Sequence, residues 1–219
     1  MPATTNEYCV IGLGAFGSAL AIELYNRGHV VLGIDQDEKV VNSHQDLLSQ
    51  VIQADATSES ALKTAGVKNY DYCIVAIGDR IEDNILTTQA VIDLGVKTIW
   101  SRAETRRHAK ILEKLGVERV VDPEFEAAHR CARVLGSTSV IDMIEFSPGF
   151  SLMEIIVGPT YSGKSLKEID FRKKYGGTVI ALRREDDTIP ITGPDIIIEE
   201  GDVLFVVGKT EEIEEIERI

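Results

Sequence analysis

Long hydrophobic runs are missing from this sequence. No apolar stretch approaches the roughly 20 residues that a membrane-spanning helix requires. Residues 1–7 also lack the charged region followed by an apolar one that marks a secretory signal. We therefore expect a cytoplasmic protein that does not itself cross a membrane.

Cysteine is scarce, with three residues in a chain of 219. Cys9, Cys73 and Cys131 lie far apart, form no Cys-x-x-Cys pair and have no histidines at ligand spacing. The spacing argues against a zinc site and predicts three buried thiols.

Positive charge is outnumbered, with 23 Lys and Arg residues against 36 Asp and Glu and a formal net charge of −13. Such a chain repels phosphate backbones and anionic lipid headgroups, which excludes sequence-independent nucleic-acid binding and adsorption to a membrane surface. The hydrophobic share of 44% and the charged share of 27% are typical of a folded globular protein. The length suits one average domain and a smaller one.

The first 122 residues repeat one pattern, in which a short apolar run is followed by a turn and by a segment of helical periodicity. The expected strands cover 8–11, 30–34, 50–53, 72–77, 98–101 and 119–121. The expected helices cover 15–27, 37–47, 59–65, 82–94 and 105–115. Six strands with helical crossovers predict an α/β fold with a Rossmann doubly wound parallel sheet.

After Pro123 the pattern changes. One amphipathic helix is expected over 126–135, followed by the small polar residues 136–139. Beyond them, short strands are expected at 152–157, 178–184, 196–198 and 203–207, with helices near 165–174 and 210–218. We therefore predict a Rossmann domain over 1–138, which includes the crossover helix, and a smaller α+β domain over 139–219.

A glycine-rich turn follows the first expected strand and opens the first helix, with the sequence Gly12-Leu13-Gly14-Ala15-Phe16-Gly17. Gly12 permits the tight turn, Gly14 lets the backbone approach a pyrophosphate, and Gly17 lets helix and strand pack closely. The helix N-terminus then receives the anion. This pattern predicts a dinucleotide-type site.

Asp35 ends the second expected strand, at the position of an acid that binds ribose hydroxyls. Such an acid repels a 2′-phosphate, so the site should prefer NAD or an adenosine phosphate to NADP. The alternative is that the glycines only form a tight turn and Asp35 caps the next helix.

Other strand ends should supply the remaining contacts, because ligands bind outside the carboxyl edge of an open parallel sheet. Asp55 has an equally open alternative as a helix N-cap. The expected ligand-binding residues are Gly12, Gly14, Ala15, Phe16, Gly17, Asp35, Gln36, Asp55, Ala56, Thr57, Ala76, Ile77, Gly78 and Arg102.

A second phosphate-binding pattern, GPTYSGKS at 158–165, matches the Walker A motif. A working P-loop also needs a long helix, a parallel sheet and a downstream acid for magnesium. The helix after Ser165 is short and the segments beyond it have the pattern of antiparallel hairpins, so we expect Lys164 to be a surface residue.

The chain resembles the RCK (regulator of potassium conductance) proteins of the Ktr and Trk potassium-uptake systems. In the first half the resemblance rests on YCVIGLGAFG at 8–17, ADAT at 54–57, VAIG at 75–78 and LEKLGVERVVDPE at 112–124. In the second half it rests on GKSL at 163–166, KYGG at 174–177 and EGDVLFVVG at 200–208. It covers nearly the whole chain.

This resemblance implies a regulatory subunit, and not an enzyme, that is peripheral to the inner face of the cell membrane. Such subunits form homodimers that assemble into an octameric ring beneath an integral-membrane K⁺ channel or transporter. They bind ATP, ADP, NAD or NADH at the glycine loop, and exchange of the nucleotide gates the pore. Glu124 matches a glutamate that acts through a divalent or sodium cation at the dimer interface, and Arg172 falls near a segment that binds cyclic di-AMP in some members.

One position departs from the family pattern. ATP-responsive Ktr members carry an arginine after the second glycine, whereas this chain has Ala15, which leaves discrimination between ATP and ADP open. Arg102, at the end of the fifth expected strand, lies near the ligand position by topology, and Arg106 or Arg107 could supply the missing charge, although such arginines more often form a solvated face.

The alternative function is an NAD-dependent oxidoreductase. No Tyr-x-x-x-Lys pair occurs in the chain, the four histidines are scattered, and about 80 residues leave little room for a substrate domain. A redox-sensing repressor would need a basic helix-turn-helix module, which the sequence lacks.

Overall fold

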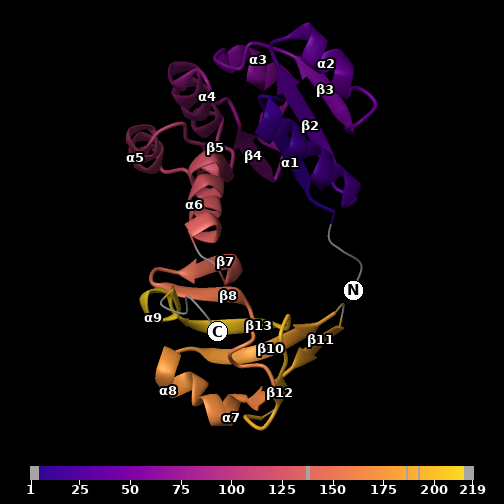
Figure 1. Ribbon diagram of the computed structural model, residues 1–219. Helices are drawn as coiled ribbons and strands as arrows, with labels where there is room; N and C mark the ends of the chain where they lie inside the picture. The colour runs from indigo at the N-terminus through magenta and orange to yellow at the C-terminus, as the bar shows by residue number, and fades with distance from the viewer. Residues whose placement is uncertain (1–4, 137–138, 186, 192, 215–219) are drawn as a thin grey trace. The chain divides into compact units, whose positions relative to one another are not determined.

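The computed structural model describes residues 5–136, 139–185, 187–191 and 193–214. The chain divides into two compact units, Met1–Pro123 and Glu124–Ile219, which Figure 1 labels by element. The domain boundary expected at 138 falls outside the described residues and stays a prediction. Within the described ranges, no helix is long and apolar enough to cross a membrane.

The first unit is a parallel sheet with the strand order β3-β2-β1-β4-β5-β6. Its strands are β1 (Glu7–Ile11), β2 (Val30–Asp35), β3 (Gln50–Gln53), β4 (Tyr72–Val75), β5 (Thr98–Arg102) and β6 (Arg119–Val121). Its helices are α1 (Ala15–Asn26), α2 (Glu38–His44), α3 (Glu59–Thr64), the 3₁₀ turn η1 (Val67–Asn69), α4 (Ile81–Asp93) and α5 (Arg106–Leu115). This order confirms the predicted doubly wound Rossmann sheet.

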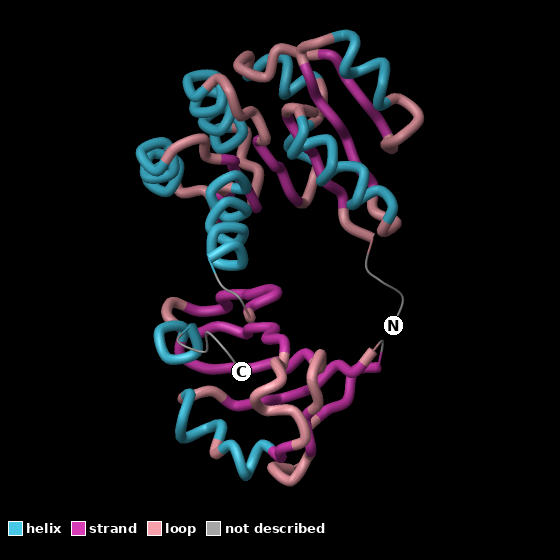
Figure 2. Tube along the Cα trace, viewed as in Figure 1, coloured by secondary structure: helices cyan, strands magenta, loops and turns pink. Residues whose placement is uncertain are grey.

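Helices pack against both faces of this sheet; Figure 2 draws them in cyan beside the magenta strands. Val10 of β1 packs in one core with α1 and α2, whereas Cys9 and Ile11 pack in the other with α3 and α4. Because both faces are buried, the central strands are apolar at almost every position.

Two of the three predicted buried thiols are confirmed. Cys9 and Cys73 are fully buried neighbours on β1 and β4, and burial raises the pKa of the Cys9 thiol well above its usual range. The prediction for Cys131 is wrong, since this side chain is exposed. It lies on α6 (Pro123–Gly136), a helix with no buried side chain among the described residues.

The second unit continues from α6 into an antiparallel sheet of order β11-β10-β13-β8-β7 and a small two-stranded sheet, β12-β9. Its strands are β7 (Val140–Ser147), β8 (Phe150–Ile156), β9 (Lys164–Ser165), β10 (Thr178–Arg184), β11 (Asp187–Pro190), β12 (Ile197–Ile198) and β13 (Val203–Lys209). Its remaining helices are α7 (Leu166–Ile169), α8 (Phe171–Tyr175) and α9 (Thr210–Glu214). The predicted α+β module is confirmed.

Two local expectations for this unit differ from the structure, and a third falls partly outside the described residues. The sequence pattern missed β7, in which apolar residues occupy exposed as well as buried positions and leave no clear alternation. The single helix expected over 165–174 is two helices, because Asp170 between them adopts a left-handed φ of 51°. Residues 215–218 of the helix expected at 210–218 lie outside the described residues.

The Walker A pattern does not form a P-loop. Lys164 and Ser165 form β9, which pairs antiparallel with β12, and the helix that follows has only four residues. The Lys164 ammonium donates to the Thr160 carbonyl at 3.0 Å and lies over the Tyr161 ring. A phosphate would find neither a parallel sheet nor a long helix here.

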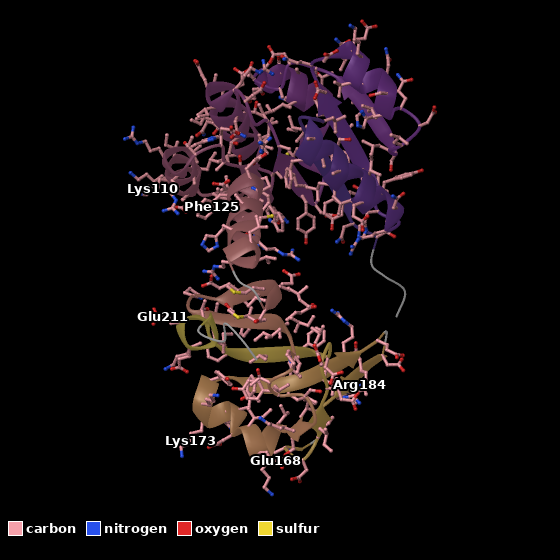
Figure 3. All side chains as sticks on the ribbon, in the orientation of Figure 1. Lys110, Phe125, Glu168, Lys173, Arg184 and Glu211 are labelled. Carbon is pink, nitrogen blue, oxygen red and sulfur yellow. The ribbon has the colours of Figure 1, made fainter. Side chains whose placement is uncertain are left out.

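An ion pair between the buried Asp202 and the partly exposed Arg184 stabilises the second unit. Arg184, labelled in Figure 3, donates two hydrogen bonds of 2.9 and 2.8 Å to Asp202, and the Glu199 N–H donates a third of 2.8 Å. The Asp202 side chain is 2% exposed. Burial opposes its ionisation, but the hydrogen bonds from Arg184 and Glu199 prevail and hold the pKa of Asp202 below its ordinary value.

Asp202→Asn is expected to lower the free energy of unfolding by about 2 kcal/mol at neutral pH, because charge-assisted hydrogen bonds are lost. A carboxyl with a lowered pKa stabilises the fold fully above its unfolded value near 3.9 and loses that effect as the pH falls through the folded value. Urea denaturation from pH 7 to pH 3 measures the difference, which should shrink with acid. Glu200→Gln, at an exposed position of the same turn, is the matched control; equal effects of the two variants would contradict this account.

Candidate functional site

The glycine turn between β1 and α1 is tightly built. Gly12 adopts a φ of 90°, and its N–H donates to the Ile34 carbonyl at 2.7 Å. A Cβ on Gly17 would lie 1.9 Å from the Gly12 oxygen, so only glycine lets α1 pack this closely against the turn. Gly14 is the N-cap of α1, and a Cβ there would meet nothing within 4 Å. The space above the helix N-terminus is open.

Asp35 lies at the end of β2 and fixes the glycine turn. Its Oδ2 accepts a hydrogen bond of 2.7 Å from the Leu13 N–H, and its Oδ1 accepts one of 2.9 Å from the Asp37 N–H. The N-cap of α2 is Asp37, which accepts from the Lys39 N–H. The helix-capping alternative for Asp35 is therefore wrong. A carboxylate has about four acceptor positions, so two remain for a ligand.

Asp55 follows β3 and forms a turn with Thr57. Its Oδ1 accepts from the Thr57 N–H at 3.0 Å and from the Thr57 hydroxyl at 2.7 Å. The hydroxyl of Thr57, and after it the Thr57 N–H, holds the pKa of Asp55 below its ordinary value. Ser58 is the N-cap of α3, so Asp55 is not the helix cap that the sequence left as an alternative.

These strand ends surround a small hollow that is open to solvent. Its described lining comprises Ile11, Gly12, Ile34, Asp35, Gln36, Ala54, Asp55, Ala56, Thr57, Ile77, Arg80 and Asp83. Seven of the residues expected from the sequence are thus brought together. Arg80 and Asp83 were missed, although their place just after the VAIG segment, at the same carboxyl edge of the sheet, could have indicated them.

The other expected residues do not line this hollow. Gly17, Ala76 and Phe16 pack beneath or beside the glycine turn, while Gly14 and Ala15 begin α1 at an exposed surface.

Arg102 extends from the end of β5 to Gly78, where a Cβ would lie 2.1 Å from its Nη1. Its side chain is 14% exposed and pairs with Glu104 at 3.3 Å. A glycine at position 78 is therefore what allows the guanidinium to lie along the ends of β4 and β5.

A buried polar group that the sequence did not reveal joins β4 to β5. The Asn84 side chain, on α4, is fully buried and donates to the carbonyls of Ile77 at 2.7 Å and Arg102 at 3.1 Å. Its Oδ1 accepts from the Ser101 hydroxyl at 3.1 Å. The amide thus holds two adjacent strand ends in place at the edge where ligands bind.

The residues expected to contribute further charge are exposed. Arg106 and Arg107 begin α5, and Glu124 lies in the first turn of α6, which belongs to the second unit. Among the described residues, no group of three or more His, Cys, Asp or Glu side chains could hold a metal ion. The cation role of Glu124 stays a prediction.

The strand order, the glycine turn and the acid at the end of β2 define the first unit as a Rossmann-type α/β domain, which is followed in the chain by an antiparallel α+β domain.

Comparison with known proteins agrees with this class. The TrkA-N domain model matches residues 8–123 and the TrkA-C domain model matches residues 152–219. The chain therefore belongs to the family of proteins in which a TrkA-N domain is followed by a TrkA-C domain, the family of the Ktr system potassium uptake proteins. The resemblance found in the sequence is confirmed.

Two curated relatives come from Bacillus subtilis (strain 168). Ktr system potassium uptake protein C is 37% identical over 97% of this chain and 96% of its own length, and Ktr system potassium uptake protein A is 34% identical over 96% and 95%. Their names are those of potassium-uptake proteins and not of enzymes, in agreement with the non-enzymatic prediction. The solved GsuK channel bound to NAD shares the fold, with a TM-score of 0.65 and 18% identity over 97% of this chain and 39% of that one.

Proposed function

We propose that this chain is the nucleotide-sensing regulatory subunit of a potassium-uptake system and that it binds ATP, ADP, NAD or NADH at the carboxyl edge of its parallel sheet. The observation that carries the proposal is the convergence of Gly12, Asp35 and Asp55 on one hollow. These features suit an adenosine diphosphate. Asp35 would bind the ribose hydroxyls, and the uncovered N-terminus of α1 would receive the diphosphate, while Asp55 supplies a second acid at the end of the third strand.

The family supports the potassium-transport role, since the Bacillus subtilis relatives are aligned over nearly their whole length. The GsuK channel bound to NAD has the same fold, which is compatible with a nucleotide at this edge. The chain would act in the cytoplasm, as a homodimer that builds an octameric ring against an integral-membrane K⁺ channel or transporter. A nucleotide shifts such a gate only by its difference in affinity for the two ring shapes.

Two further ligands belong to this proposal. Glu124 would bind a divalent or sodium cation at the dimer interface, near the nucleotide phosphates. Arg172 and the apolar side chains of Leu166, Phe171 and Val179 line a hollow in the second unit, and cyclic di-AMP would bind there, with the guanidinium near its phosphates.

A thermal-shift panel tests the proposed function. ATP, ADP, NAD and NADH are added separately to the full chain, with GDP as the control nucleotide. A ligand present at 100 times its Kd stabilises the native state by about 2.7 kcal/mol, so at least one adenosine nucleotide should raise the Tm by several degrees while GDP does not. If none of the four raises the Tm, the nucleotide-sensing function is wrong. Light scattering then measures the size of the oligomer with and without bound nucleotide and so tests the octameric ring.

A further inference from the structure

Arg80 lies across the hollow from Gln36, the residue that follows Asp35. It lies at the N-cap of α4, yet its Nη1 donates a hydrogen bond of 3.2 Å to the Gln36 side-chain oxygen, 44 positions earlier in the chain. Both residues line the hollow. The pair therefore spans the space between the ends of β2 and β4.

Each end of this bridge is held by its own partner. The Arg80 guanidinium lies 2.7 Å from Asp83 in the first turn of α4. The Gln36 carbonyl accepts a hydrogen bond of 3.0 Å from the Gln53 side chain on β3. The crossing hydrogen bond joins two exposed side chains that are each anchored on their own side of the hollow, so these side chains can separate without disturbing the strands.

Arg80 also has no capping function for α4. It occupies the N-cap position, where Ser, Thr, Asp or Asn would accept a hydrogen bond from the helix, and it makes no side-chain cap. Among the described residues that line the hollow it is the one cation, facing the carboxylates of Asp35, Asp55 and Asp83. Its side chain is 46% exposed, which leaves it room to swing outward.

We propose that Arg80 and Gln36 form a latch over the adenosine half of the nucleotide site. The latch opens when a nucleotide enters and closes over the bound nucleoside, so it slows the release of every ligand that contains adenosine. This inference rests on the proposed function and assigns Arg80 as the residue that sets how long the ligand stays.

A double-mutant cycle on ligand release tests the latch. NADH is bound to the full chain, its release is followed by fluorescence after mixing with excess ADP, and ADP affinity is measured by calorimetry. Arg80→Ala and Gln36→Ala should each raise the dissociation rate about five- to tenfold, with association changed less than twofold. Because the two side chains are the ends of one contact, the double variant should release NADH no faster than either single variant.

Arg27→Ala is the matched control. It removes the same charge from the same unit, at the exposed C-cap of α1, where Arg27 pairs with Glu23 outside the hollow, and it should leave the release rate unchanged. Unaltered release by Arg80→Ala, or effects of the two variants that multiply in the double variant, would overturn the latch while leaving the proposed function intact. Failure of the unsubstituted chain to bind any of ATP, ADP, NAD and NADH would overturn both.

Discussion

Gly17→Ala is expected to destabilise the first unit by about 2–3 kcal/mol, as overpacking at a backbone contact does. The new methyl group would lie 1.9 Å from the Gly12 carbonyl oxygen and 2.9 Å from the Ala76 Cβ. Neither neighbour is the end of a flexible side chain, so α1 must move away from β1. This loss outweighs the roughly 1 kcal/mol that alanine normally gains over glycine inside a helix. Thermal unfolding of the full chain should show a Tm that is lower by several degrees.

Gly14→Ala is the counterpart, three residues earlier. A Cβ there meets nothing within 4 Å, and the φ of −67° suits any residue. We expect an unchanged Tm without nucleotide and a weaker thermal shift with ADP, because the methyl group occupies the path of the pyrophosphate. If the two variants unfold at the same temperature, the packing role assigned to Gly17 is wrong.

Asp35→Ala is expected to reduce the affinity for adenosine nucleotides about a hundredfold, since it removes the acceptors of two charge-assisted hydrogen bonds to the ribose. At an ADP concentration of 100 times the original Kd, the stabilisation of about 2.7 kcal/mol would fall to about 0.4 kcal/mol. NADP should give no shift with the unsubstituted chain, because the carboxylate repels its 2′-phosphate. In Asp35→Ala, the thermal shifts produced by NAD and by NADP should become nearly equal.

The variant also loses the acceptor of the Leu13 N–H, so its unliganded Tm will be lower, and each shift is measured from that baseline. Asp46→Ala, which removes the same charge from an exposed position outside the hollow, is the control. A full ADP shift in Asp35→Ala would show that the ribose does not contact this acid.

The first unit could be predicted closely because its signals are local. The expected helices and strands agree with α1 to α5 and β1 to β6 to within a few residues, since apolar periodicity and turn residues report directly on βαβ units. The second unit was harder to predict from the sequence. β7 has no alternation to detect, and the break at Asp170 depends on a left-handed residue that the sequence does not mark.

The residues of the candidate site likewise divide into those that the sequence could identify and those that it could not. The glycine turn and Asp35 have a recognisable order and spacing, so the sequence was sufficient to identify them. The capping alternatives for Asp35 and Asp55 could be removed only once Asp37 and Ser58 were seen to cap α2 and α3. Asn84, Arg80 and Asp83 lie far from the glycine turn in sequence and reach the site only through the parallel pairing of β1 with β4.

By itself the sequence determined the Rossmann class, the family and the acid expected to prefer NAD over NADP, because each depends on a short segment whose chemistry is complete within a few residues. The tertiary structure alone decided which strand ends share one hollow and that Arg80 meets Gln36 across it. These outcomes depend on contacts between segments tens of residues apart, and the pairing of strands creates such contacts without leaving a local mark in the chain.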